Sequence, residues 1–171
     1  EKRAQEVLAA LGLHWDDLEG KTVLDVGANE GEVAQAAIYH NNIHVTSVDI
    51  SSPPHVAENI REQYYIADAA KLPFTNNAFD ICISHAAPFL DSIETNPFTE
   101  IHEMMRAVSS EIRIGPVFVK NDSELSEQRA FKYIKREFPT AEISYALPQS
   151  APNPEGYRRA YVRIRKEISA D

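Results

Sequence analysis

The segment Thr22-Val-Leu-Asp-Val-Gly-Ala-Asn-Glu-Gly31 decides how the rest of the chain is interpreted. Its first five residues are apolar or β-branched apart from Asp25, and they predict a buried strand. Gly27 and Gly31 predict a tight turn into a helix, because glycine adopts positive φ angles and lets a ligand approach the backbone. Ligands of open α/β sheets bind beyond the carboxyl ends of the strands, so we expect this turn to contact one. A turn that merely connects strand and helix is the alternative.

The side chains of this turn favour a ligand with a cationic centre. A dinucleotide-binding turn needs glycine at relative positions 1, 3 and 6, which here hold Gly27, Asn29 and Glu32. The Gly-Lys-Ser/Thr sequence of a phosphate-binding loop is also absent. Glu30 and Glu32 would repel a pyrophosphate, whereas they tolerate a positive charge.

Apolar, β-branched segments alternate along the chain with segments of helical periodicity, as in a parallel sheet covered on both faces. The predicted strands are 22–26, 43–49, 64–67, 79–84, 112–119, 141–147 and 158–168, and the predicted helices are 1–11, 32–40, 56–63, 98–108 and 123–138. We therefore expect one α/β domain over residues 1–171, with a three-layer, doubly wound, Rossmann-like fold. Its seven-stranded sheet is mostly parallel, and only the terminal strand is antiparallel.

The charge and cysteine content exclude several classes of protein. The chain carries 26 acidic and 17 basic residues, a formal charge of −9, and the excess lies in residues 1–119. An acidic body disfavours nucleic acid, which is bound mainly through lysine and arginine. A single cysteine, Cys82, and histidines without ligand spacing predict no disulfide and no metal site. Short apolar runs predict no membrane span, and no secretory leader is evident, so we expect a cytoplasmic protein.

Four motifs follow one another between residues 20 and 119. They are Val23-Leu-Asp-Val-Gly-Ala-Asn-Glu-Gly31, Val45-Thr-Ser-Val-Asp-Ile50, Tyr65-Ile-Ala-Asp-Ala-Ala-Lys-Leu-Pro-Phe74 and Asn77-Ala-Phe-Asp-Ile-Cys-Ile-Ser84. In this order and spacing they resemble the class I S-adenosylmethionine-dependent methyltransferases, with Asn29 in place of the commoner middle glycine. The resemblance implies a methyltransferase fold and S-adenosylmethionine as the cofactor.

The resemblance also implies which residues bind the cofactor. They are Asp25, Gly27, Ala28, Asn29, Gly31, Asp49, Ile50, Asp68, Ala69 and Ser84. Asp49 would accept both ribose hydroxyls, and Ile50 would form an apolar wall for the adenine. Asp68 and Ala69 would bind the adenine edge, and Asp25 would lie near the methionine amino group. The alternatives are a strand-end acid or helix cap for Asp49 and an Asx-turn for Asp68.

The sequence indicates the catalytic residues less clearly than the cofactor-binding residues. His85, predicted just past the fourth strand, is the candidate base, because the ordinary pKa of histidine is about 6.5. A structural role for His85 is the alternative. His14, Trp15, Tyr64 and Phe89 are candidates for an acceptor pocket or for simple packing. A larger side chain at Gly27 or Gly31 would be expected to occupy ligand space.

We expect a methyltransferase that acts on a small-molecule acceptor, with a homodimer left open. One alternative is a non-catalytic S-adenosylmethionine-binding protein of the same fold. Another is an RNA-directed methyltransferase, which only Arg158, Arg159, Arg163 and Arg165 favour. The Pro-rich segment 148–157 is predicted to reach the acceptor mouth, where Tyr157, Arg158 and Arg159 could hold an acidic acceptor. A plain surface connection is the alternative for this segment.

Overall fold

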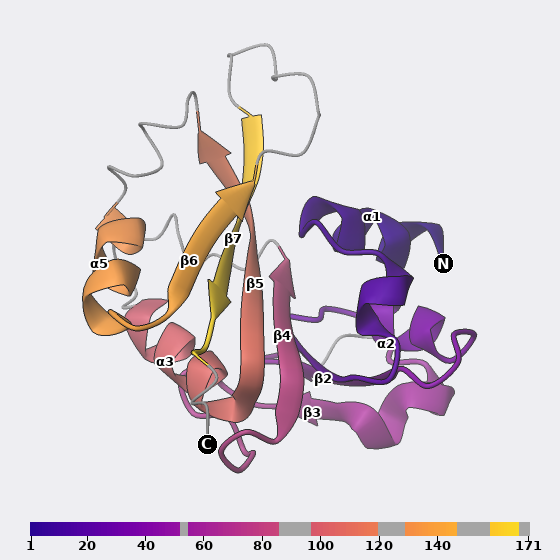
Figure 1. Cartoon of the computed structure of the whole chain (residues 1–171). Helices are drawn as coiled ribbons and strands as arrows, with labels where there is room; N and C mark the ends of the chain where they lie inside the picture. The colour runs from indigo at the N-terminus through magenta and orange to yellow at the C-terminus, as the bar shows by residue number, and fades with distance from the viewer. Residues whose placement is uncertain (52–54, 86–96, 120–128, 147–157, 168–171) are drawn as a thin grey trace.

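The computed structural model describes residues 1–51, 55–85, 97–119, 129–146 and 158–167 (Figure 1). These residues form a seven-stranded sheet of order β3-β2-β1-β4-β5-β7-β6. The strands are β1 Thr22–Val26, β2 His44–Asp49, β3 Tyr64–Ile66, β4 Phe79–His85, β5 Val108–Val119, β6 Glu142–Ala146 and β7 Arg158–Arg165. The helices are α1 Lys2–Ala10, α2 Glu32–Ala37, α3 Pro97–Ala107 and α5 Arg129–Glu137, with 3₁₀ helices η1 Trp15–Leu18 and η2 Glu58–Gln63.

The strand directions confirm the predicted fold class. Strands β3, β2, β1, β4 and β5 are mutually parallel, and β7 pairs antiparallel with both β5 and β6. Strand β6 therefore runs in the same direction as the first five, as expected for residues 141–147. The antiparallel strand is last in the chain, but it lies inside the sheet between β5 and β6.

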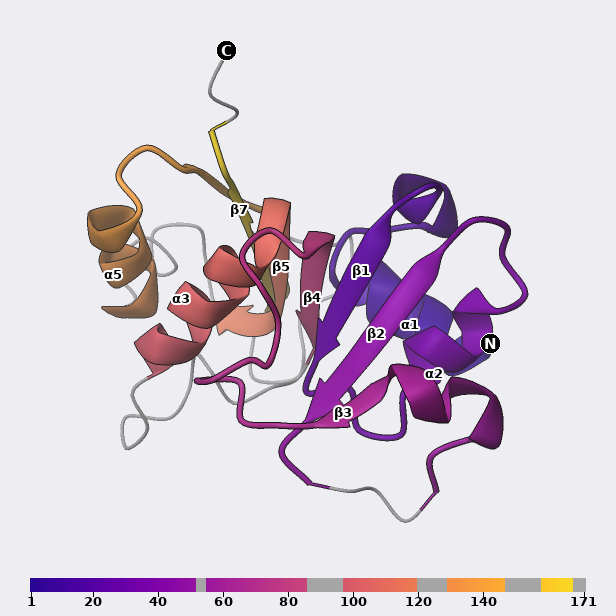
Figure 2. The same cartoon turned by 90° about the horizontal axis from the view of Figure 1, so that it is seen from below.

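Alternate residues of the central strands β1 and β4 pack into two separate cores. Val23 packs with α1 and α2 in one cluster, whereas Leu24 packs with α3 and α5 in the other. The two helix pairs consequently lie on opposite sides of the sheet (Figures 1 and 2). This arrangement is the three-layer architecture that the alternation of strands and helices predicts.

Some boundaries differ from the predicted ones. Strand β5 begins at Val108, directly after α3, and not at residue 112. The start of β5 was not predicted because its first residues are largely polar. In the paired strand, Glu111 and Arg113 alternate with Ile112 and Ile114, which are buried in the core. Segment 56–63 forms a 3₁₀ helix over Glu58–Gln63, and α2 ends at Ala37, three residues early. Of the predicted helix 123–138, the described part is α5.

Candidate functional site

The turn after β1 is held by backbone hydrogen bonds from the neighbouring strand. The N–H groups of Gly27 and Ala28 both donate to the carbonyl of Val48, at 2.8 and 3.1 Å. Gly27, Asn29 and Gly31 have φ angles of 76°, 49° and 75°. Asparagine tolerates this left-handed region better than most residues, so Asn29 can stand where the commoner sequence has glycine.

A cavity of about 200 Å³ opens beside this turn, at the carboxyl ends of β1 and β4. Five predicted site residues line it together: Asp25, Gly27, Ala28, Asn29 and His85. Helix α2 contributes Glu32 and Val33, and helix α1 contributes Arg3 and Val7. The cavity therefore lies where ligands bind in open α/β sheets, beyond the carboxyl ends of neighbouring strands.

Asp25 is a strongly perturbed group in the cavity. It is only 4% exposed, inside β1. Burial raises the pKa of its carboxyl to about 7, and repulsion from Glu32 and then Asp49 adds to the effect. Three carboxyl groups thus face one small region, where a cation would relieve their repulsion. The donor set therefore fits a ligand with an ammonium or sulfonium group and disfavours a pyrophosphate.

Asp49 at the end of β2 holds the turn from the other side. Its Oδ2 accepts a hydrogen bond from the N–H of Asn29 at 2.9 Å. Its Oδ1 accepts the N–H and the hydroxyl of Ser51, both at 3.1 Å. A carboxylate has about four acceptor sites, so Oδ2 retains one, while a hydroxyl arriving at Oδ1 would displace Ser51 Oγ.

Gly31 packs against protein. A Cβ at this position would lie 2.6 Å from Ile60 Cδ1 and 3.4 Å from Ser47 Oγ. The expectation that a larger side chain here would occupy ligand space is therefore wrong, because η2 fills that direction. Nearby, the Tyr64 hydroxyl donates to the carbonyl of Asn29, which ties β3 to the turn.

The residues predicted for the adenine end lie outside the cavity lining. Asp68 accepts the N–H of Ala70 on Oδ1 at 2.8 Å, which is the Asx-turn contact. Ala69 is half-buried against the core. Ile50 is 73% exposed, immediately after β2. An exposed isoleucine beside a polar strand end offers an apolar surface to a ligand.

Ser84 and His85 end β4 in different environments. Ser84 is fully buried, and its hydroxyl donates to the carbonyl of Val26 at 2.8 Å. It joins β4 to β1 below the turn and does not line the cavity. His85 is half-buried and does line it, as the last residue of the strand and not the first residue after it.

A family model described as a methyltransferase domain matches residues 24–111, just over half of the chain. The chain belongs to this methyltransferase family. The match begins in β1 and ends in β5, so it includes the turn, Asp49 and His85 of the methyltransferase domain.

Solved structures share the fold of this methyltransferase domain along nearly its whole length. The [4+2]-cyclase SpnF has a TM-score of 0.68 and 18% identity, over 98% of this chain and 81% of that chain. The 1,6-didemethyltoxoflavin-N1-methyltransferase of Burkholderia thailandensis, with bound 1,6-didemethyltoxoflavin and S-adenosylhomocysteine, has a TM-score of 0.65 and 18% identity, over 98% and 78%. A SAM-dependent methyltransferase of Aquifex aeolicus has a TM-score of 0.60 and 16% identity, over 96% and 89%. No curated protein sequence matches the chain. Family and fold agree with S-adenosylmethionine as the cofactor.

The other predicted pocket residues of the methyltransferase domain lie elsewhere. Trp15 stacks on His40 with 4.0 Å between ring centroids, and His14 is the N-cap residue of η1, where its backbone N–H donates to Asp17 Oδ2 at 2.8 Å. Neither lines the cavity, nor does Tyr64. Phe89 and the Pro-rich segment 148–157 lie outside the described residues, as do the side chains of Arg158 and Arg159.

Sequence reasoning missed Arg3 and Val7. The helical stripe placed Val7 on the apolar face of α1, but no local signal tells which edge of the sheet that helix covers. Within the described ranges, no cluster of three or more His, Cys, Asp or Glu residues could hold a metal ion. Among the same residues, no helix combines the length and apolar character needed to cross a bilayer.

Proposed function

We propose that this methyltransferase domain binds S-adenosylmethionine at the turn after β1 and transfers the methyl group to a small-molecule acceptor. The observation that carries the proposal is the cavity that joins Asp25 and the glycine turn to His85. Asp25 and Glu32 supply acidic groups for a cationic ligand, and His85 at the end of the neighbouring strand β4 supplies a base.

The residues around the cavity suit the two ends of this cofactor. Asp25 and Glu32 would bind the methionine ammonium. Both carboxyl groups line the cavity and repel each other, and a bound cation would relieve this repulsion. Arg3, a cation in the same lining, would pair with the methionine carboxylate. Asp49 would accept the ribose hydroxyls, with Ile50, Asp68 and Ala69 around the adenine. These roles agree with the order of the motifs along the chain.

When bound, S-adenosylmethionine supplies a methyl group already activated by its sulfonium. The chain's contribution is then mainly to align the acceptor, and such positioning is worth about 7–11 kcal/mol in favourable cases. His85 would accept the proton of a hydroxyl or amine acceptor. A base is needed only where the acceptor must lose a proton, so its role depends on the acceptor.

A small molecule is a better acceptor than RNA for the described part of the chain. Of the four arginines that favour RNA, Arg163 and Arg165 contact Glu111 on β5, nearer the amino end of that strand than the cavity. These two arginines therefore lie away from the cavity in which we propose that methyl transfer occurs. Among the arginines whose side chains the structure describes, Arg3 is the one that lines the cavity.

Calorimetric titration with S-adenosylmethionine and S-adenosylhomocysteine tests the first half of the proposal. We expect both to bind, and we expect Asp25→Asn to weaken both. The second half is tested with methyl-labelled cofactor against a panel of small hydroxyl and amine compounds, with a short RNA as a separate arm. Labelled small product supports the proposal. Binding without turnover across the panel would favour a non-catalytic domain or another reaction, as in the similar cyclase, and labelled RNA would overturn the acceptor class.

A further inference from the structure

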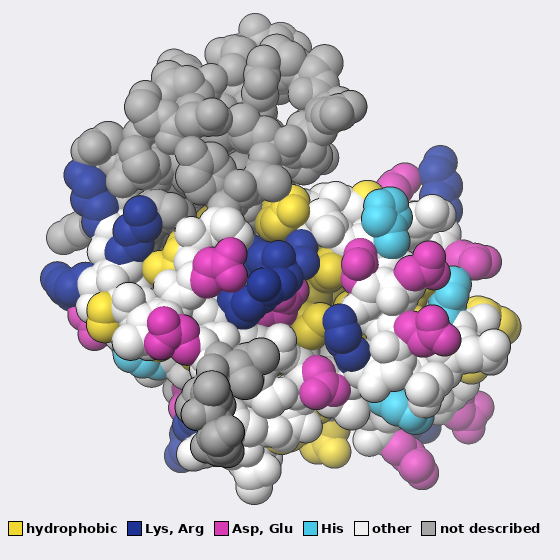
Figure 3. Space-filling model, in the orientation of Figure 1, with side chains coloured by type: hydrophobic (Ala, Val, Ile, Leu, Met, Phe, Trp, Pro, Cys, Tyr) yellow, Lys and Arg dark blue, Asp and Glu magenta, His cyan; other side chains and the backbone are white. Residues whose placement is uncertain are grey.

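A second hollow, of about 320 Å³, lies away from the cofactor cavity. Its cationic lining comes from Lys21, just before β1, from Arg113 on β5 and from Arg163 and Arg165 on β7. Asp17 and Glu111 are its acidic residues. In Figure 3, basic side chains gather near the middle of this face with acidic ones beside them. The hollow is unusual because the body of the chain is acidic.

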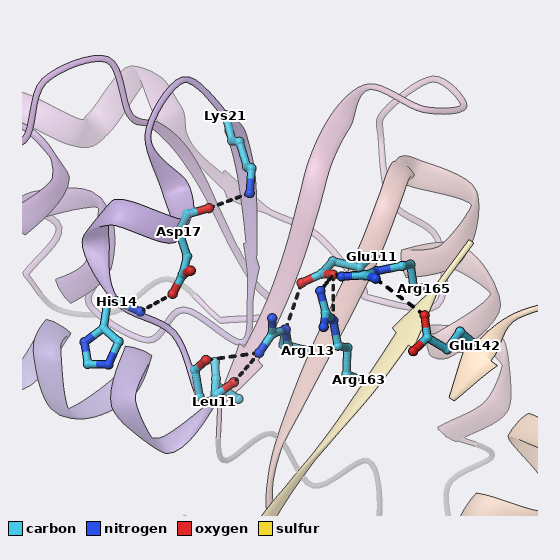
Figure 4. A network of polar contacts seen from close by, with 10 residues as sticks. Leu11, His14, Asp17, Lys21, Glu111, Arg113, Glu142, Arg163 and Arg165 are labelled. Carbon is cyan, nitrogen blue, oxygen red and sulfur yellow. Dashed lines mark hydrogen bonds and ion pairs between the residues drawn. The ribbon is translucent and has the colours of Figure 1, made fainter. Parts of the chain in front are cut away.

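The strand register explains why the arginines meet. Glu111 pairs with Arg165 and Arg113 with Arg163 across the antiparallel β5–β7 ladder. Residues two apart on a strand point to the same face, so the four side chains form one patch. The intervening Ile112 and Ile164 point to the opposite face and are buried in the α3–α5 core. Figure 4 shows this patch with its polar contacts.

A single buried carboxylate orders three guanidinium groups. The Glu111 side chain is 5% exposed, and its Oε1 accepts Arg113 Nε at 2.8 Å. Its Oε2 accepts Arg163 Nε at 2.7 Å and Arg165 Nε at 3.4 Å. Arg113 is held further by the carbonyls of Leu11 and Gly12, at 3.2 and 3.1 Å. The guanidinium groups are thus positioned in advance of any ligand.

The charge in the hollow is not balanced by Glu111. One carboxylate offsets one of the three guanidinium charges. Lys21 Nζ donates to the backbone carbonyl of Asp17, whose carboxylate accepts the N–H of His14. Glu142 of β6 contacts Arg165 at 3.4 Å from an exposed position, where solvent screens most of its attraction. A compact anion would complete the coordination, because guanidinium forks match the oxygens of a phosphoryl group.

We propose that this hollow binds a phosphoryl group, either of a small phosphorylated ligand or of free phosphate. A compact anion fits better than an extended nucleic acid, because the described cations converge on one hollow and do not follow a groove. The site does not depend on the proposed methyl transfer, since it lies toward the amino ends of β1, β4 and β5. The cofactor cavity lies at the carboxyl ends of β1 and β4.

Titration calorimetry with inorganic phosphate, at constant ionic strength balanced by chloride, tests the site on the whole chain. We expect saturable binding that Arg165→Gln weakens by about fivefold, since Arg165 is 41% exposed and its contacts are long. Lys21→Gln should weaken binding as well, which provides a second reading if Arg165→Gln does not fold. Arg136→Gln is the matched control, because it removes an equal charge from α5, where the side chain is 72% exposed.

Glycerol 3-phosphate and a single-stranded RNA serve as further probes. Tighter binding of glycerol 3-phosphate than of phosphate identifies a phosphorylated small molecule as the ligand class, and equal binding identifies free phosphate. Both results support a phosphoryl site. The proposal is overturned if phosphate does not saturate, if Arg136→Gln loses as much affinity as Arg165→Gln, or if RNA binds through Arg165 while phosphate does not compete.

Discussion

The carboxylate of Asp49 lies 2.9 Å from the backbone nitrogen of Asn29, and this hydrogen bond joins the end of β2 to the turn after β1. Asp49 therefore acts on the cofactor site in two ways. It offers acceptor oxygens at the strand end, and it holds a turn whose φ angles are positive at three positions. Loss of its side chain would affect both.

The first prediction concerns this contact. Asp49→Ala should weaken S-adenosylmethionine binding at least about tenfold, because charged hydrogen bonds contribute roughly 1.5–3 kcal/mol each. Asp49→Asn should fall between the wild type and the alanine variant, since it keeps one acceptor oxygen. Ser51→Ala is the control: it removes only the hydroxyl contact to Oδ1 and should leave the affinity within about twofold. Calorimetry on folded variants measures all three, and unchanged affinity in Asp49→Ala would contradict a ribose contact.

The second prediction concerns pH. The pKa of Asp25 is about 7 in the fold against 3.8 for an ordinary aspartate, so between these values the folded chain binds the extra proton. Stability from this group is therefore greatest at low pH and declines as the pH rises toward 7. Asp25→Asn should raise the free energy of unfolding at pH 8 by roughly 2–4 kcal/mol, and the gain should shrink toward pH 5. Urea unfolding at both pH values measures this difference.

Binding of a cationic cofactor should reverse that proton uptake. The ionised carboxylate is the form that attracts an ammonium, so affinity for S-adenosylmethionine should rise between pH 6 and pH 8 and binding at pH 6 should release a proton. In Asp25→Asn the affinity should be lower at pH 8 and nearly independent of pH. Calorimetry in buffers of different ionisation enthalpy counts the protons, and a flat profile in the wild type would argue against this role.

The third prediction separates packing from ligand contact at Gly31. Gly31→Ala should lower the free energy of unfolding by about 2–4 kcal/mol, because its φ is 75° and the added carbon meets Ile60 Cδ1. Ile60→Val deletes that δ carbon, so the double variant should be less destabilised than the sum of the two single changes. Chemical denaturation measures the cycle. Additive effects of the two changes would contradict the contact with Ile60. A Gly31→Ala variant with full stability but lost cofactor affinity would indicate that Gly31 contacts the ligand.

The fourth prediction concerns Ser84. Its hydroxyl is committed to the carbonyl of Val26, so Ser84→Ala should cost about 1–3 kcal/mol of stability. Cofactor affinity should change by less than about threefold, since the lost contact lies below the turn. A stable variant with a tenfold weaker affinity would instead indicate a direct contact between this hydroxyl and the cofactor.

The fifth prediction concerns His85. With an acceptor from the panel, His85→Gln should lower kcat by about 10²-fold or more and leave S-adenosylmethionine affinity unchanged, as expected for a general base. Substitution of exposed His44 on β2 is the control, because that residue is outside the cavity. A loss below about tenfold, or a parallel loss of stability, would assign His85 to packing.

Much of the fold could be predicted from the sequence because strands and turns follow from local patterns of residues. The run from Thr22 to Gly31 predicts a strand, a glycine turn and the start of a helix. Strand β1 occupies its first five residues, and α2 begins directly after it at Glu32. The start of β5 was not legible. Ser109, Ser110 and Glu111 are unfavourable in an isolated strand. Glu111 pairs with Ile81 of β4 and with Arg165 of β7, and the two serines lie where the register between β4 and β5 shifts.

The sequence by itself determined the order of strands and helices, the turn with its positive φ positions, and the acids at the ends of β1 and β2. These features depend on hydrophobic periodicity and on the chemistry of single residues, so residues that are close together in the sequence are enough to predict them. Only the tertiary structure decided that Arg3 of α1 reaches the cavity, that Gly31 faces Ile60, and that Glu111 gathers arginines from two strands. Each of these contacts joins residues far apart in sequence, and their partners depend on which helix covers which part of the sheet and on the register of β5 against β7.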